Sequence, residues 1–565
     1  MVSAIFYRAT LKRPWVSLAG TAATVTAGLA FGLEAYADRQ ERQVVHHHHG
    51  KTTAEIEEAL AAGIGLPRAY DRDQIRWYWL QRPISVLKRF GEIAIELGPV
   101  VANYYIQEKV FPPSSSSWDD TIGSFEEQLR LQHHAEQLRE ALTNLGPAWV
   151  KGGQQLAIRP DLVPPTVLKE LQKLCDSVRP IPDEIAHQLL RDELNVDDLS
   201  TVFSDLRLVA SASLGQVYQA RLLQPLAPSA DRLFSAYRRK NSPSEPDQTL
   251  GQLVAIKIQR PGMRKSFSLD LFLLQQWAEF VDSFTSIFTR QAPYHRALFD
   301  AFAQGSYSEL DYENEARNQK HFQQELRVRG CKVKVPNVYD EYTTQRVLTT
   351  EWIQGVKLAD SSPEKIRELI PVGVELFLTQ LLDIGAFHAD PHPGNLLVTE
   401  DEGVLCLLDF GLTADVDPNA REAMTKAIVH LLYRDFDSLV TQDAKELGFL
   451  PHDFDTSELK PILTKVLTGG VLESGSDLRK RKRKLQEISN ELNEIFFRYP
   501  FQVPPFFALV TRGLGLLEGI ALTGDPEFDI FRASVPYATR RAVGMMGRHM
   551  TGRRQKASTS DPMGF

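Results

Sequence analysis

The sequence predicts an α+β protein in which a strand-rich lobe is followed by a helical lobe, with further helices in front of both. Residues 206–222 alternate apolar and polar side chains, as half-buried strands do, and residues 253–258 form a short apolar run typical of another strand. Residues 53–142 instead carry apolar side chains at helical spacing. The length of 565 residues leaves room for three or four domains.

Composition and charge favour an ordinary globular protein. The chain is 43% hydrophobic and 24% charged, which gives no reason to expect wholesale disorder. Its net charge of -8 gives no support to nucleic acid as a partner. Cys175, Cys331 and Cys406 are far apart and lack the spacing of metal ligands, so they suit a reducing compartment.

The N-terminus has the composition of a leader. Residues 1–33 contain no acidic side chain, and an uncharged run over residues 14–33 follows three basic residues. That run is long enough to cross a bilayer, but it consists mostly of Ala, Gly and Thr, so its insertion energy is marginal. An acid-free basic leader is also typical of an organelle transit peptide. We expect targeting, with a membrane anchor as the alternative, and assign residues 1–50 to this leader and a linker.

Residues 51–200 are expected to form a helical extension. Lys151 and Gln154 stand three residues apart in it and would share a helix face. Gly152 and Gly153 between them each cost about 1 kcal/mol relative to Ala in a helix, so they serve something other than helix propensity. By spacing alone, a solvent-facing polar pair beside glycines that permit close packing is the more ordinary interpretation.

Residues 201–354 are expected to form the strand-rich lobe, with an insertion of unassigned role at 225–252. Loops that close bare backbone over nucleotide phosphates usually carry several glycines. The turn of the 206–222 hairpin keeps only Gly215, and Ala and Ser hinder positive φ, so we expect a stiffer loop with different phosphate contacts. The candidate nucleotide-binding residues of this hairpin are Ala210, Ser211, Ala212, Ser213, Gly215 and Val217.

Lys257 is the one cation in the predicted strand at residues 253–258, which also contains Ala255. A buried Lys is unfavourable unless it is paired, and this favours a phosphate-binding role. Its counter-ion should be a helical acid, for which Glu309, Asp311 and Glu315 are available. Asp311 and Glu315 are four residues apart and would lie on one helix face, whereas Glu309 would point elsewhere or precede the first turn.

Residues 346–353 are expected to form an edge strand that leads into a hinge at Gln354 and Gly355. In a nucleotide-binding lobe, adenine would hydrogen-bond to backbone there. The candidate residues are Thr350, Glu351 and Trp352.

A carboxylate, an amide and a second carboxylate form the most specific chemical grouping in the chain. Asp390 precedes Asn395 by five residues, and Asp409 begins an Asp-Phe-Gly sequence. Two short apolar strands, 396–398 and 404–408, would form a hairpin that brings Asn395 beside Asp409. In phosphoryl transfer, the first Asp orients the attacking hydroxyl, and the Asn and second Asp hold metal ions. A polar loop with a buried hairpin is the alternative, but the register favours a nucleotide site.

Residues 355–540 are expected to form the helical lobe, followed by a disordered tail over 541–565. Six successive cations at 479–484 could bind anionic lipid, but the acidic residues that follow favour a solvated helix face. The aromatic and apolar run at 496–522 is interrupted by two charges, which favours lobe core over a membrane-inserting surface.

Taken together, these motifs resemble the UbiB/ADCK family of atypical protein-kinase-like proteins over roughly residues 140–530. The resemblance implies a two-lobed protein-kinase-like fold whose helical N-terminal extension covers the active site and blocks large protein substrates. The extension's Lys-x-Gly-Gln segment corresponds to Lys151 to Gln154, and the Glu-x-Asp pair that engages it corresponds to Glu309 and Asp311. Ser211 departs from the family's alanine-rich loop.

The resemblance also implies roles in the active site. Lys257 would bind nucleotide phosphates with Glu315 as its ion-pair partner, and Asp390 would take the catalytic role of orienting the acceptor hydroxyl or water. Asn395 and Asp409 would hold metal. The implied cofactors are ATP or ADP with Mg2+.

The family is linked to isoprenoid-quinone metabolism, which implies an atypical kinase or ATPase associated with a membrane or lipid droplet. Two proline-aromatic segments at 499–501 and 504–509, with residues 81–83, look most like the plastid and cyanobacterial branch. The plastid is therefore expected, and the mitochondrion is the alternative. Expected partners are a nucleotide, a lipid or prenylquinone-related molecule, and proteins of a biosynthetic complex.

Two other functions remain open. The chain could be a nucleotide-gated lipid-binding or scaffold protein with little catalysis. It could also be a kinase of protein substrates, which the alanine-rich loop and the Lys-x-Gly-Gln segment disfavour.

Overall fold

The computed structural model divides into two compact units. The N-terminal unit comprises residues 1–314 and 341–349, and the C-terminal unit comprises residues 315–340 and 350–565. The insertion after residue 223, the basic run at 479–484, the tail and Asp390 lie outside the described residues. The described residues are 30, 32–39, 65–110, 125–157, 165–175, 180–223, 251–288, 295–389, 393–433, 435–457, 459–461, 505–530, 532–537 and 539–541.

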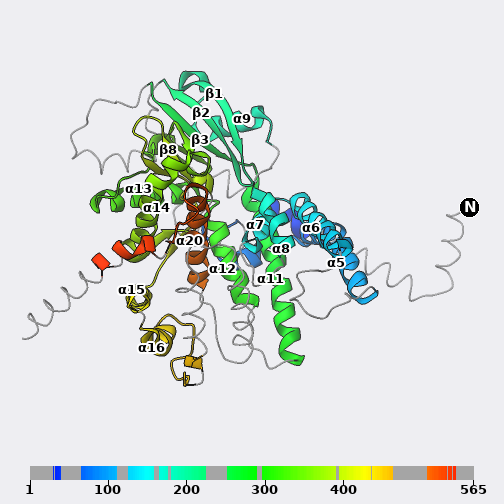
Figure 1. Ribbon diagram of the computed structural model, residues 1–565. Helices are drawn as coiled ribbons and strands as arrows, with labels where there is room; N and C mark the ends of the chain where they lie inside the picture. The colour runs from blue at the N-terminus through cyan, green and yellow to red at the C-terminus, as the bar shows by residue number, and fades with distance from the viewer. Residues whose placement is uncertain are drawn as a thin grey trace, which may run out of the picture. The chain divides into compact units, whose positions relative to one another are not determined.

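A four-stranded sheet in the order β1-β2-β3-β5 begins in the N-terminal unit. Its strands are β1 (Phe203–Ser211), β2 (Gly215–Leu222), β3 (Leu253–Gln259) and β5 (Val347–Glu351). The predicted hairpin and edge strand are confirmed, because β1 pairs antiparallel with β2 and β5 ends the order. Helix α9 (Asp183–Leu194) lies beside the sheet in Figure 1, and the Tyr218 hydroxyl donates to Asp183 Oδ1 over 2.6 Å.

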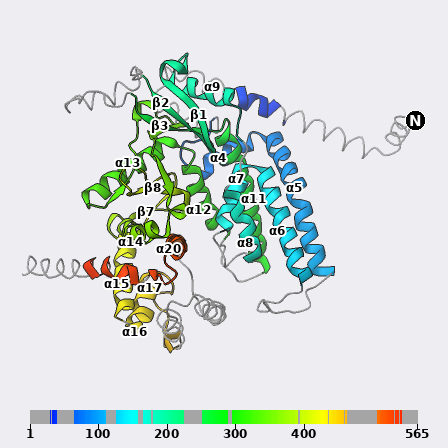
Figure 2. The same ribbon diagram turned by 45° about the horizontal axis from the view of Figure 1, so that its top comes forward.

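The helices of the N-terminal unit pack side by side, as Figure 2 shows for α5, α6 and α11. Their shared core includes Tyr78, Trp79, Phe267 and Tyr307, each 1% exposed or less. The helical pattern predicted for residues 53–142 is confirmed where this range is described. The helices are α4 (Arg72–Leu80), α5 (Pro83–Val110), α6 (Phe125–Leu145), α7 (Pro147–Leu156), α8 (Pro165–Gln172), α11 (Met263–Phe288) and α12 (His295–Ser308).

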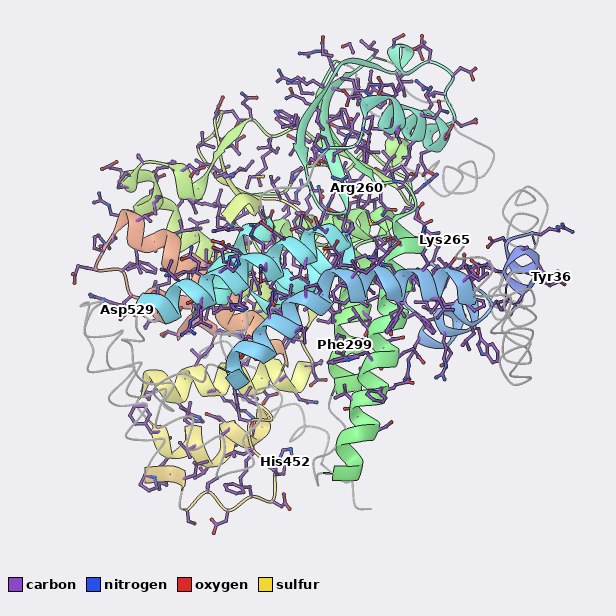
Figure 3. All side chains as sticks on the ribbon, turned by 90° about the vertical axis from the view of Figure 1, so that its right-hand side faces the viewer. Tyr36, Arg260, Lys265, Phe299, His452 and Asp529 are labelled. Carbon is purple, nitrogen blue, oxygen red and sulfur yellow. The ribbon has the colours of Figure 1, made fainter. Side chains whose placement is uncertain are left out.

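Residues 32–39, within the predicted leader and linker, form a helix that is built into the N-terminal unit. Figure 3 shows Tyr36 on this helix. Asp38 Oδ1 accepts a 3.0 Å hydrogen bond from Nε of Arg82, whose side chain is fully buried. Glu34 accepts from the Ile84 backbone N–H over 3.0 Å, at the first turn of α5. A buried cation needs a carboxylate, and the first N–H groups of a helix need acceptors, so both acids have structural roles.

Removing the carboxylate of Asp38 is therefore expected to destabilise the fold. Asp38→Ala should lower the free energy of unfolding by about 2 kcal/mol, because Arg82 stays buried after losing a charged acceptor. Chemical denaturation of the wild type and of Asp38→Ala measures this difference. Asp197→Ala, at an exposed acid, is the control. Equal stability of the two Ala variants would contradict the structural role.

The C-terminal unit contains a second four-stranded sheet, in the order β4-β9-β8-β6, and a separate pair of strands, β7 and β10. The predicted α+β class is confirmed by these two units. Helix α13 (Tyr312–Val328) and strand β5 contribute residues to both of them. The strands are β4 (Val333–Lys334), β6 (Gly355–Lys357), β7 (Ala386–His388), β8 (Leu396–Thr399), β9 (Leu405–Leu407) and β10 (Thr413–Asp415). The longer helices are α14 (Pro363–Leu378), α15 (Pro418–Leu432) and α20 (Pro505–Gly524).

Helix α20 packs against α14 and forms part of the C-terminal unit's core (Figure 1). Leu517, Ile520 and Ala521 are 4%, 4% and 1% exposed. A Cβ on Gly513 would lie 2.3 Å from the Phe377 ring, so glycine permits this close approach. The prediction of lobe core is confirmed for this part of the apolar run. Among the helices that the structure describes, none combines the length and apolarity needed to cross a membrane.

Candidate functional site

Asn395 and Asp409 flank the open end of one hairpin. Strands β8 and β9 pair antiparallel, with Leu396 opposite Leu407. The Leu408 N–H donates to the Asn395 carbonyl over 2.9 Å, which closes the hairpin beside both residues. The predicted hairpin is therefore confirmed, and it places the amide and the carboxylate at the same end of the sheet.

Asp409 has an unusual backbone conformation. Its φ is +59°, a left-handed value that is uncommon for residues other than Gly and is enriched for Asp and Asn. Asp409 Oδ1 accepts a 3.1 Å hydrogen bond from the Gly411 N–H, and Asp409 is exposed while Phe410 is fully buried. The chain thus turns sharply here, so that the carboxylate faces solvent and the next side chain enters the core.

His388 holds the Asp409 backbone. The imidazole Nε2 of His388 contacts the Asp409 carbonyl and lies 3.1 Å from the Leu408 carbonyl. The backbone N–H of His388 donates to Gln380 Oε1 over 2.8 Å. Strand β7, which ends at His388, pairs with β10, and Thr413 lies opposite His388. Sequence pattern alone assigned no role to His388. Gln380 gave no sequence signal.

The donor set fits Mg2+. The Asn395 amide and the Asp409 carboxylate supply hard oxygen ligands, and Mg2+ in nucleotide sites takes only one or two carboxylates beside waters and phosphate oxygens. Within the described parts of the chain, no three His, Cys, Asp or Glu side chains gather as a metal site. The position of Asp390, the remaining acid of the motif, lies outside those parts.

Cys406, on β9, takes no part in such chemistry. It is fully buried, and burial raises the pKa of its thiol to about 12. The side chain therefore stays a neutral thiol in the core of the hairpin.

Lys257 lies on β3 directly opposite Val217 of β2. The strand alternates, with Val254, Ile256 and Ile258 fully buried and Ala255 and Lys257 half-buried on the other face. The predicted strand with a single cation is therefore confirmed, and its apolar side chains are buried on one face. Lys257 Nζ lies 5.1 Å from the centroid of the buried Tyr312 ring, a cation–π distance.

Glu315 lies on α13 and is 3% exposed. Such burial of an acid requires compensation by a cation or by hydrogen bonds. Its role as the ion-pair partner of Lys257 stays a prediction.

The turn between β1 and β2 is held by Arg260, the residue after β3, which Figure 3 labels. Arg260 Nη2 donates to Ser211 Oγ over 2.9 Å, and Nε donates to the Ala212 carbonyl over 3.2 Å. Ala212 N–H also donates to the Gly215 carbonyl over 2.8 Å. Ala210 and Ser211 belong to β1, and Ser213 lies in the turn itself. The arrangement supports the prediction of a stiff loop, and Arg260 is a contributor that sequence reasoning missed.

Gly215 is required for close packing rather than for an unusual φ. A Cβ there would lie 2.4 Å from the Ile258 carbonyl oxygen and 2.6 Å from the Tyr312 hydroxyl. The single glycine kept in the loop therefore lets β2 approach β3 and α13.

Glu309 and Asp311 lie between two helices. Helix α12 ends at Ser308 and α13 begins at Tyr312, so the prediction that Asp311 and Glu315 share one helix face is wrong. Asp311 Oδ1 instead accepts from the Glu313 N–H over 3.1 Å, as an N-cap residue does. A short acidic side chain just before a helix favours this capping over continuing the helix.

Lys151 joins the extension to this junction. Its Nζ lies 2.7 Å from Glu309 Oε2, and the two side chains are 11% and 10% exposed. The contact between these two segments that the resemblance implies is therefore present, and the solvent-facing interpretation of Lys151 is wrong. Its regulatory role stays a prediction.

Gln154 and Asp311, which were also predicted to join the extension to this junction, have different partners. Gln154 Nε2 donates to the Leu174 carbonyl over 3.2 Å, within the extension itself. Asp311 pairs with Arg68 at 3.5 Å, a partner that the sequence did not indicate. Gly153 permits close packing, because a Cβ there would lie 2.5 Å from Leu174 Cδ1.

The predicted hinge residues follow the end of the first sheet. Thr350 forms an isolated bridge with Val338, and the Glu351 N–H donates to the Asn337 carbonyl over 2.8 Å. Glu351 also pairs with Lys334 at 2.9 Å. The Glu351 N–H is thus engaged within the C-terminal unit, and the role of these residues in binding adenine stays a prediction. Trp352 follows β5, with its indole N–H 3.4 Å from Gln354 Oε1.

Comparison with known proteins gives the same family as the motifs. The sequence model of the ABC1 atypical kinase-like domain matches residues 247–443. The chain is 34% identical to Protein ACTIVITY OF BC1 COMPLEX KINASE 3, chloroplastic, of Arabidopsis thaliana, over 82% of this chain and 58% of that protein. It therefore spans little more than half the length of this relative.

Two relatives are matched over more of their own length. The uncharacterized protein slr1919 of Synechocystis is 36% identical, over 84% of this chain and 76% of that protein. Protein ACTIVITY OF BC1 COMPLEX KINASE 1, chloroplastic, of Arabidopsis thaliana is 31% identical, over 87% of this chain and 67% of that protein. Matched at this identity over most of the length of these relatives, the chain belongs to the ABC1, or UbiB/ADCK, family of atypical kinase-like proteins.

Proposed function

We propose that this chain is an atypical kinase or ATPase that binds ATP or ADP together with Mg2+. The observation that carries the proposal is the β8–β9 hairpin, whose open end holds Asn395 and the exposed carboxylate of Asp409. An amide and a carboxylate so placed are the metal-binding pair of phosphoryl-transfer sites. Membership of a kinase-like family supports the same conclusion.

Each residue of the proposed site has a distinct task. Bound Mg2+ would supply positive charge that stabilises the charge developing on the nucleotide phosphates. Asn395 and Asp409 hold and orient the ion, and Lys257 binds the α- and β-phosphates with Glu315 as its counter-ion. Asp390 orients the acceptor hydroxyl or water.

We further propose that the protein acts in prenylquinone metabolism in the plastid, associated with a membrane or lipid droplet. The names of two relatives contain the word chloroplastic, and another relative comes from Synechocystis. The motifs shared with the UbiB/ADCK family support the link to quinone lipids.

Nucleotide binding by the purified full chain tests the enzymatic proposal. At a concentration near 100 times Kd, a ligand that binds only the folded state stabilises it by about 2.7 kcal/mol. We therefore expect Mg2+–ATP or Mg2+–ADP to raise Tm by several degrees, and nucleotide with EDTA to raise it much less. Identical melting curves with and without Mg2+–nucleotide would reject the proposed function.

A lipid-binding function is the second candidate, and one surface favours it. Helix α5 presents a hollow lined only by apolar side chains and glycine, with Phe90 60% and Val101 64% exposed. The other lining residues are Ile93, Ala94, Leu97, Gly98 and Ala102. Exposed apolar surface of this kind typically marks a binding site. The described part of the C-terminal apolar run, by contrast, packs in a core.

Rescue in cells that lack the protein separates the two functions. Asp390→Asn is designed to keep nucleotide binding and lose turnover. Rescue of prenylquinone levels by this variant would favour the binding function, and failure to rescue would favour the enzyme.

A further inference from the structure

Asn318 connects helix α13 to the Asp-Phe-Gly segment. It lies one turn after Glu315 on this helix, and its Nδ2 donates to the Phe410 carbonyl over 3.1 Å. Phe410 directly follows Asp409 in the chain. A side chain of the helix that carries Glu315 therefore fixes the peptide next to the proposed metal ligand.

Phe322, four residues after Asn318 on the same helix, contacts the same segment through its ring. The Phe322 and Phe410 ring centroids are 5.4 Å apart, and the two side chains are 1% and 0% exposed. Helix α13 thus holds Phe410 twice, once by its backbone carbonyl and once by its ring. Both contacts lie within the C-terminal unit.

These contacts lie beside the backbone of Asp409, which has an uncommon conformation. A non-glycine residue at a φ of +59° persists where its surroundings over-determine it. The carbonyl of Asp409 contacts His388, and the carbonyl of Phe410 accepts from Asn318. The two peptide groups that follow the Asp409 Cα are therefore each fixed by a side chain, and together they set the direction of the carboxylate.

We propose that Asn318 is a positioning residue, which couples the placement of α13 to the orientation of Asp409 toward Mg2+. The inference rests on the proposed function only for the identity of the ion. Because Glu315 and Asn318 share one helix, a shift of that helix changes the proposed lysine counter-ion and the metal ligand together. Sequence pattern alone does not predict this role, because an Asn among the polar and charged residues of a helix is ordinary.

Asn318→Asp tests the coupling, because it keeps the side-chain shape and replaces the donor by a carboxylate facing a carbonyl. Gln319→Glu is the matched control. Gln319 is the next residue of α13, is 3% exposed, and donates its amide to the Pro336 carbonyl over 2.7 Å, away from the Asp-Phe-Gly segment. Both variants lose one hydrogen bond from a side-chain amide to a backbone carbonyl, and both gain one negative charge on the same helix.

We expect amide hydrogen exchange in peptides covering residues 405–412 of the nucleotide-free protein to accelerate in Asn318→Asp and to stay at the wild-type rate in Gln319→Glu. The apparent affinity for Mg2+ in nucleotide binding should fall about tenfold in Asn318→Asp alone, as for other residues that orient a metal ligand. At saturating Mg2+, kcat should approach the wild-type value. Asn318→Ala, which removes the donor and adds no charge, serves if the Asp variant does not fold.

Equal exchange rates in the two matched variants would overturn the proposal. So would an unchanged Mg2+ dependence in Asn318→Asp when wild-type protein shows one. If wild-type protein binds no Mg2+–nucleotide, the proposed function fails, and the exchange rates alone then decide whether Asn318 positions Asp409.

Discussion

Asp409→Asn is expected to lower Mg2+-dependent nucleotide turnover by about 10³-fold. The substitution keeps the size of the side chain and removes the negative charge at the proposed metal site. A metal ion supplies several kcal/mol of transition-state stabilisation, and the loss of about 4 kcal/mol corresponds to this factor. Steady-state kcat/KM of the purified full chain, measured across a Mg2+ titration, checks the value.

The structure indicates that this variant folds. Asn tolerates positive φ about as well as Asp, and its side-chain oxygen can accept the Gly411 N–H that Asp409 accepts now. Asp401→Asn is the matched control, because Asp401 is an exposed acid in the turn of the same hairpin, where it accepts the Glu402 N–H. Turnover that survives Asp409→Asn, or falls equally in both variants, would contradict the metal-binding role.

Local sequence pattern was sufficient for the parts of the site that lie on one hairpin. The two apolar strands around the turn at 399–403 determined the register, and the register placed Asn395 beside Asp409. The β1–β2 hairpin and Lys257 on β3 followed from the same kind of pattern. In each case, the residues that must meet are close in the sequence or belong to strands that pair directly.

Contacts between distant segments could not be derived from pattern. His388, Arg260, Asn318 and Arg68 are ordinary polar residues whose partners lie on other elements, and nothing in their spacing names those partners. The helix face expected for Asp311 and Glu315 was wrong for a different reason, although Glu309 does precede the first turn of α13, which was one of its two expected positions. An acidic run is compatible both with a helix face and with an N-cap, and only the position of the first helical residue distinguishes them.

Lys151→Met is expected to lower the free energy of unfolding by about 3–4 kcal/mol, because it leaves Glu309 buried beside a neutral side chain. Glu309→Gln should be destabilising for the corresponding reason. The double variant Lys151→Met/Glu309→Gln should recover about 2 kcal/mol of the summed loss, since neither buried charge then remains. Denaturant unfolding of the four proteins measures the coupling.

Lys173→Met is the control that separates burial from the loss of an ion pair. Lys173 pairs with the buried Glu170 on the same extension, but the Lys173 side chain itself is 59% exposed. After Lys173→Met, Glu170 keeps a second cation, because Arg139 Nε lies 3.4 Å from its other carboxylate oxygen. Because the lost cation is screened by solvent, this variant should lose at most about 1 kcal/mol. If Lys151→Met were as mild as Lys173→Met, or the two buried changes were simply additive, the salt bridge would not hold the extension to the α12–α13 junction. The junction would then depend on Arg68 and on the apolar packing around Tyr307.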